Sequence, residues 1–130
     1  MSRFSAILTE HAMAPLNRGQ LEHADGIGVV GTPGRGPAFA LYLAIDDHLI
    51  KDARFQCNGC GTLVACGSML TESIRDKHIE EITSFWVEEL IQLLGGVPTD
   101  KTHCPDMALR ALNLAVEDYQ STNSESRSIS

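Results

Sequence analysis

The sequence lacks any long apolar run. No stretch approaches the roughly 20 consecutive apolar residues that a membrane-spanning helix requires, so we expect no membrane-embedded part. Residues 1–15 also lack the apolar core of a secretory signal peptide, since Glu10 and His11 interrupt their short amphipathic pattern. We therefore expect a cytoplasmic protein.

Basic residues are scarce as well. The chain has 10 Lys and Arg against 17 Asp and Glu, which gives a net charge of −7 and a pI of about 5.1. This balance argues against nucleic-acid binding, which needs basic patches for the phosphate backbone, and is compatible with a basic partner protein. A chain of 130 residues with 43% hydrophobic and 21% charged residues is typical of one folded domain.

Cysteines are few, but they lie in two clusters. Of the four cysteines, Cys57 and Cys60 form a C-x-x-C pair, and Cys104 directly follows His103. In a reducing compartment such thiols are more often metal-binding or reactive than disulfide-bonded. Thiolate and imidazole are ligands that suit zinc and iron–sulfur clusters, so the two clusters are candidate metal ligands.

The predicted positions of Cys60 and Cys104 favour a role as reactive thiols or metal ligands. Cys60 lies where a strand ends and a helix begins, and Cys104 lies at a helix start before Pro105. Helix N-termini lower the pKa of a thiol, although both cysteines can also be read as small buried hydrophobes. Cys57 is either a zinc-knuckle ligand or a core residue at a strand end. Cys66 lies on the apolar stripe of its helix and is expected in the core.

The hydrophobic pattern predicts strands first and helices after them. Period-two alternation marks the strands, and apolar residues three and four apart mark the helices. The expected elements are a helix at Met1–Ala14, strands at Gly26–Thr32, Phe39–Ile45 and Leu49–Cys57, and helices at Leu63–Ile74, Ile79–Thr83, Val87–Leu94 and Pro105–Tyr119. This order predicts an α+β fold, with a three-stranded antiparallel sheet packed against helices on one side.

Residues 1–120 are expected to form this single domain. Leu16–Asp25 is polar and is predicted to be a loop, and the Ser-rich residues 121–130 are predicted to form a disordered tail. Gly26–Gly31 matches the G-x-G-x-x-G pattern of dinucleotide-binding sites. That function is rejected, because the pattern must follow a strand and open a helix, whereas here Thr32-Pro33-Gly34 follows it.

With these residues in place, the chain resembles the iron–sulfur cluster scaffold family of IscU-type proteins and the N-terminal domain of NifU. The resemblance covers about Pro15 to Gln120. The motifs that carry it are Asp52-Ala53-Arg54-Phe55 with Gly59-Cys60-Gly61, Leu93-Leu94-Gly95-Gly96-Val97-Pro98, Lys101-Thr102-His103-Cys104, and Gly31-Thr32-Pro33 with Gly36.

The resemblance implies a scaffold rather than an enzyme. It would receive sulfur from a cysteine desulfurase, assemble a [2Fe–2S] cluster, and pass it to acceptor apo-proteins with the help of an Hsp70-type chaperone pair. Matching positions give Cys60 and Cys104 as cluster ligands, His103 as a nearby ligand or modulator, and Lys101 as the lysine of the family pattern.

The chain departs from the family in the loop that carries the first ligand. Arg35 replaces the first cysteine of Ala-Cys-Gly-Asp and Pro37 replaces its aspartate, and an arginine cannot ligate a metal. Cys57 is the candidate replacement ligand, with Arg35 offsetting the negative charge of the cluster. The chaperone-binding segment is altered too, since Val97–Lys101 keeps only the first proline and the lysine of Leu-Pro-Pro-Val-Lys.

Three functions remain open at this point. The first is a cluster scaffold or carrier with a rearranged ligand set, loaded with a [2Fe–2S] cluster or iron. The second is a zinc-binding acceptor that takes a persulfide from a desulfurase by thiol exchange. The third is a degenerate interaction module that kept the fold and lost the site; the retained Cys60, His103 and Cys104 argue against it.

Overall fold

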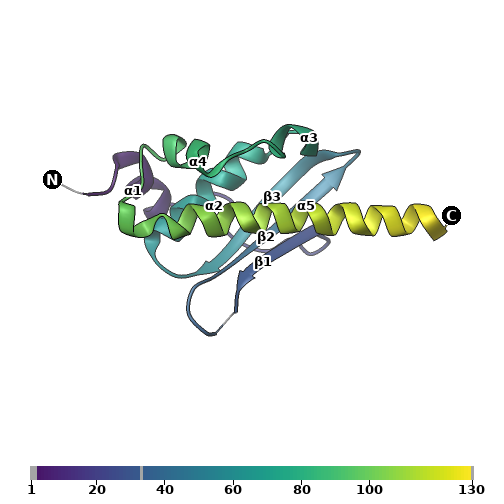
Figure 1. Ribbon diagram of the computed structural model, residues 1–130, viewed down its shortest axis with the longest axis horizontal. Helices are drawn as coiled ribbons and strands as arrows, with labels where there is room; N and C mark the ends of the chain where they lie inside the picture. The colour runs from purple at the N-terminus through teal and green to yellow at the C-terminus, as the bar shows by residue number, and fades with distance from the viewer. Residues whose placement is uncertain (1–2, 33, 130) are drawn as a thin grey trace.

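The fold is a three-stranded antiparallel sheet with helices packed on it, as a computed structural model of residues 3–32 and 34–129 shows (Figure 1). The strand order is β1-β2-β3, and β1 and β3 each pair antiparallel with β2. The elements are α1 (Ala6–Met13), β1 (Gly26–Gly31), β2 (Ala38–Asp46), β3 (Leu49–Asn58), α2 (Gly61–Ile74), α3 (Ile79–Ile82), α4 (Val87–Leu93), a 3-10 turn η1 (Thr99–Lys101) and α5 (His103–Ile129).

The helices cover one face of the sheet. Helix α5 packs on β1 and β2, and α2 packs on β3, while α1 lies against α2 and α4 contacts both α2 and α5 (Figure 1). Burial alternates along β1, and along β2 from Phe39, because successive side chains of a strand point to opposite faces. The prediction of an α+β fold with helices on one side of the sheet is confirmed.

The turn between β2 and β3 lies between the second and third strands that the sequence predicts. Asp47 and His48 both have positive φ, at 52° and 65°, and connect Asp46 to Leu49. A two-residue turn with two positive φ angles matches the right-handed twist of the paired strands. The two longest strands are thereby held in register.

The core lies between the sheet and the helices α2 and α5. Phe39 and Phe55, on neighbouring strands, stack with ring centroids 5.7 Å apart and are fully buried. The other large, fully buried apolar side chains among the described residues are Leu41, Leu43, Ile50, Leu63, Leu70, Ile74, Leu90, Leu94 and Leu112. Burying these apolar side chains is the main driving force for bringing the helices onto the sheet.

Glycines decide how closely the helices approach. A side-chain carbon at Gly28 would lie 2.0 Å from the carbonyl oxygen of Ala111 in α5. One at Gly67 in α2 would lie 2.4 Å from the ring of Phe55. Gly26 and Gly28 of the G-x-G-x-x-G pattern therefore form a packing surface for α5, in keeping with the rejection of dinucleotide binding.

Two segments differ from their predicted structure. Asn17–Gly19, predicted as loop, lies along the edge of β3: Phe55 N donates to Asn17 O at 3.1 Å, and Gly19 N donates to Phe55 O at 2.8 Å. Helix α5 continues to Ile129, through the Ser-rich segment predicted to be disordered, and residues 106–129 contain neither glycine nor proline to end it. Neither backbone pairing nor helix continuation can be seen in hydrophobic periodicity.

None of the helices described is long and apolar enough to cross a membrane.

Candidate metal centre

Three connections meet at one end of the sheet. The β1–β2 loop and the link from β3 to α2 are neighbours there, because Ala38 at the start of β2 pairs with Asn58 at the end of β3. Pro37 of that loop would contact a side-chain carbon at Gly59 at 3.8 Å. The start of α5 lies at the same end of the molecule (Figure 1).

The segment before α5 is shaped by glycine and proline. Gly95 and Gly96 have positive φ, and their N–H groups donate to Gln92 O and Ile91 O, which ends α4. Pro98 then begins the short η1 turn, whose last residue is Lys101. This sharp reversal starts α5 at His103, so that Cys104 lies in its first turn.

Cys60 and Cys104 come together at this end. Their Sγ atoms are 3.7 Å apart. Cys60 is half-buried as the N-cap residue of α2, whereas Cys104 is only 1% exposed. Two thiolates bound to one tetrahedral metal ion at about 2.3 Å each stand roughly 3.8 Å apart, so the pair already has the separation of two metal ligands.

His103 lies beside the Cys60–Cys104 pair and offers a third candidate ligand. Its Nε2 atom lies 3.6 Å from Cys104 Sγ, although the two residues are adjacent in the chain. An imidazole nitrogen and a thiolate on one tetrahedral ion stand about 3.5 Å apart, given bonds of roughly 2.0 and 2.3 Å. Within residues 3–32 and 34–129, however, no three Cys, His, Asp or Glu side chains gather closely enough to hold a metal ion. Metal binding therefore requires rotation of a ligand, and the exposed His103 ring is free to make that movement.

The two thiols differ in acidity. Burial raises the pKa of Cys60, but the backbone N–H groups of Leu63 and Thr62, the Cys104 thiol and the Lys101 charge outweigh it and leave that pKa below its usual value. Burial, and then the negative charge of Cys60, raise the pKa of Cys104 to about 12. Cys60 is thus the first of the pair to become a thiolate, while Cys104 keeps its proton.

A small cavity opens beside Cys60. It measures about 270 Å³ and lies between α1 and the start of α2. Apolar side chains of α1, among them Leu8 and Met13, line one side, and Cys60 and Lys101 line the other. The thiol that ionises first therefore borders a space large enough for a small group and lies near a positive charge.

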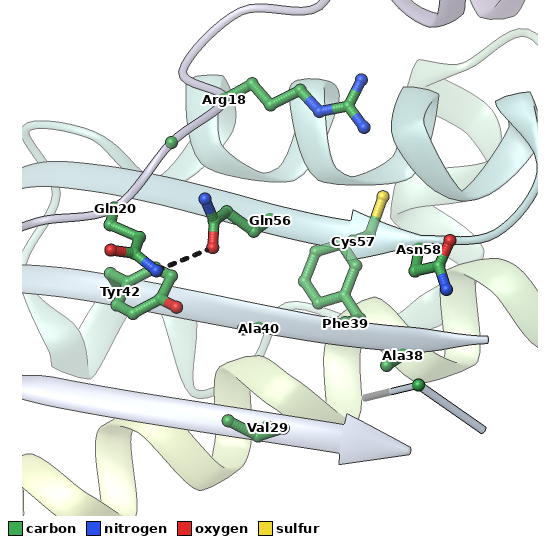
Figure 2. A pocket seen from close by; sticks show the side chains of 12 residues that line it. Arg18, Gln20, Val29, Ala38, Phe39, Ala40, Tyr42, Gln56, Cys57 and Asn58 are labelled. Atoms are coloured by element: carbon green, nitrogen blue, oxygen red, sulfur yellow. Dashed lines mark hydrogen bonds between the residues drawn. The ribbon is translucent and has the colours of Figure 1, made fainter. Parts of the chain in front are cut away.

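Cys57 lies at the end of β3, three residues before Cys60, and pairs with Phe39 of β2. Burial raises the pKa of its thiol, and the positive charge of Arg18 opposes that shift. Figure 2 shows the sulfur of Cys57 pointing toward the side of β3 on which Arg18 lies. Among the described side chains, Cys57 makes no hydrogen bond to Cys60 or Cys104, so its ligation stays a prediction.

Arg18 is a neighbour of Cys57 that the sequence did not single out. Its backbone is held beside Phe55 by the edge pairing of Asn17–Gly19, which no local sequence pattern announces. A hollow of about 550 Å³ lies on the uncovered side of the sheet, lined by Val29, Ala40, Tyr42 and Gln56 and bordered by Cys57 (Figure 2).

Arg35 and Cys66 take no part in the thiol pair. The Arg35 side chain is exposed, and its backbone N–H donates to Thr32 O at 2.9 Å within the β1–β2 loop. Cys66 is fully buried in α2, and burial raises the pKa of its thiol strongly. The placement of Cys66 in the core is confirmed.

Comparison with known proteins gives a consistent family. Residues 4–126 match the model of the NifU-like N terminal domain. The iron-sulfur cluster assembly scaffold protein IscU 1 of Archaeoglobus fulgidus is 38% identical over 116 residues, which cover 89% of this chain and 76% of that protein. The protein IscU of Haemophilus influenzae is 33% identical over 121 residues, with 90% of this chain and 95% of that protein covered.

A solved structure has the same fold. The N-terminal NifU-like protein of Brucella abortus superposes with a TM-score of 0.72, covering 90% of this chain and 94% of that one. Its sequence identity is only 14%, so this likeness bears on the fold alone.

Proposed function

Because the chain belongs to the NifU-like N-terminal domain family, we propose that it is an iron–sulfur cluster assembly scaffold or carrier with a rearranged ligand set. The observation that carries the proposal is the 3.7 Å separation of Cys60 and Cys104. Relatives that are 33–38% identical over most of the chain, and that are named as such scaffolds, support it. The role is that of a protein that holds its cargo rather than of an enzyme.

Cys60, Cys104, His103 and Cys57 are the proposed ligands of the cargo, a [2Fe–2S] cluster or its iron. Clusters of this type take four ligands, and histidine replaces cysteine in some of them. Cys60 and Cys104 need no rearrangement to bind one iron, whereas His103 and Cys57 must turn toward it.

Positive charge suits this cargo. A cluster held by thiolates is negatively charged, and Lys101 already acts electrostatically on both Cys60 and Cys104. Arg35, on the neighbouring β1–β2 loop, is proposed to help offset the same charge where the family has a ligand cysteine. The cysteine desulfurase, the Hsp70-type chaperone pair and the acceptor apo-proteins are the partners that this role requires.

The test is the content of iron, acid-labile sulfide and zinc per chain after anaerobic purification and reconstitution. We expect near-equal iron and sulfide. Zinc without sulfide would instead support a persulfide acceptor, and neither metal would support an interaction module. Cys66→Ala is the matched control, because this cysteine is buried in the core and is not one of the proposed ligands. The iron and sulfide content of this variant is expected to stay at the wild-type level.

The fourth ligand is tested separately. If Cys57 completes the site, Cys57→Ser is expected to abolish cluster loading while leaving the Cys60–Cys104 pair intact. Unchanged iron and sulfide in this variant would remove Cys57 from the ligand set. Iron content and the visible absorption of the cluster give the two readouts.

A further inference from the structure

The Cys60–Cys104 pair has the geometry of a reactive dithiol as well as that of a ligand pair. The sulfur atoms are 3.7 Å apart, and a disulfide requires about 2.05 Å, so closure needs a relative movement of less than about 2 Å. Cys60 precedes α2 as its N-cap and is half-buried, and it can therefore turn without disturbing the helix. Cys104 is fixed in the first turn of α5 and serves as the stationary partner.

The two thiols differ in access to a reactant. Cys60 borders the cavity of about 270 Å³, whereas Cys104 is 1% exposed. An incoming sulfur donor can therefore reach Cys60 and not Cys104. The cavity also leaves room for an additional sulfur atom on Cys60, and Lys101 lies at its wall.

We propose that Cys60 and Cys104 act together to reduce a persulfide and release hydrosulfide at the site. The Cys60 thiolate first attacks the outer sulfur of a persulfide or polysulfide donor and becomes Cys60–S–SH. The S–S bond of the donor breaks, and the donor leaves as a thiolate or a shortened polysulfide. The thiolate of Cys104 then attacks Cys60 Sγ, the S–S bond to the outer sulfur breaks, and HS⁻ leaves. The sulfane sulfur gains two electrons, the two cysteines become a disulfide, and the Cys104 proton is lost to solvent.

This activity deepens the proposed scaffold role, since it supplies sulfide where iron would bind. An external dithiol must then reduce the disulfide before the same cysteines can hold metal. Disulfide and metal-bound states are thus mutually exclusive. Because Cys104 is only 1% exposed, released sulfide is followed to completion rather than as an initial rate.

The test uses reduced, metal-free protein that is loaded with inorganic polysulfide and then desalted. We expect wild-type protein and Cys66→Ala to release about one sulfide per chain and to end with a Cys60–Cys104 disulfide, identified by peptide mass spectrometry. Cys104→Ser should keep its added sulfur and release at least roughly ten-fold less sulfide until dithiothreitol is added. Cys60→Ser should take up no sulfur at position 60 and form no disulfide at Cys104.

Two results would overturn the inference: wild-type protein that keeps its persulfide, or a disulfide that maps to Cys57 and Cys60. Peptide mapping of the wild-type chain decides between these results even if Cys104→Ser fails to fold, which circular dichroism would reveal. The assay contains no iron. Its failure would therefore leave the scaffold proposal intact, whereas failed cluster loading from added sulfide would contradict the scaffold and not the dithiol.

Discussion

The middle of the sheet and the end that carries the thiols differ in how closely their side chains are packed. Where α5 and α2 cross the sheet, Gly28 and Gly67 leave no room for even one more carbon atom. At the thiol end, Cys60 is half-buried, a cavity lies beside it, and the sulfur atoms are not covalently joined. Stability therefore resides mainly in the first region and chemistry in the second, which means that each can be altered with limited effect on the other.

The largest effect on stability is expected from adding a side chain to a glycine that packs against α5. Gly28→Ala places a carbon 2.0 Å from a backbone oxygen of Ala111, a clash that no side-chain rotation relieves. We expect a loss of roughly 3 kcal/mol in the free energy of unfolding, measured by urea denaturation. Gly61→Ala is the control, because its new carbon would meet Ala12 at an ordinary 3.5 Å and should change stability by less than about 0.5 kcal/mol.

The next effect is confined to the thiol end. Cys60→Ser is expected to weaken Zn²⁺ binding by more than roughly 100-fold, because the proposed site would lose a direct ligand and even outer-shell partners can matter that much. Competition with a chromophoric chelator measures the affinity. Since Cys60 is half-buried, the free energy of unfolding of the metal-free protein should change little. A variant that binds zinc like the wild type would exclude Cys60 from the site.

A smaller effect is expected where α1 joins the two regions. The buried hydroxyl of Ser68 contacts His11 Nδ1 at 2.7 Å and accepts from Leu16 N at 2.9 Å. Ser68→Ala leaves these groups without that partner and should cost about 1 kcal/mol, read from thermal or urea unfolding. Ser73→Ala, which removes only a bond within α2 to Met69 O, is the matched control and should cost less.

The smallest expected effect concerns pH. The pKa of Cys60 lies below its usual value and that of Cys57 lies above it, so Cys60 becomes a thiolate at lower pH. In metal-free protein, iodoacetamide should modify Cys60 first, and its rate should level off at a lower pH than the rate at Cys57. Pulsed labelling followed by peptide mass spectrometry gives both profiles. Equal profiles would mean that the backbone N–H groups of α2 do not act on Cys60.

Local patterns in the sequence were sufficient for most of the fold. Period-two alternation along Phe39–Ile45 and Leu49–Cys57 predicted the paired strands β2 and β3, and helical spacing predicted α2. The proximity of Cys60 and Cys104 was expected only through the family resemblance, because periodicity does not bring distant residues together. The sequence could not predict that Arg18 is a neighbour of Cys57, because its place there depends on a backbone pairing with Phe55.

By itself, the sequence determined most of the strands and helices and which cysteines lie at helix starts, because periodicity and helix-start residues act over a few positions. Only the tertiary structure decided that Cys104 is buried while Cys60 borders a cavity, and that their sulfur atoms stand 3.7 Å apart. These properties depend on how closely α2 and α5 approach the sheet. That approach is set by steric contacts at Gly28 and Gly67 with residues remote in the chain.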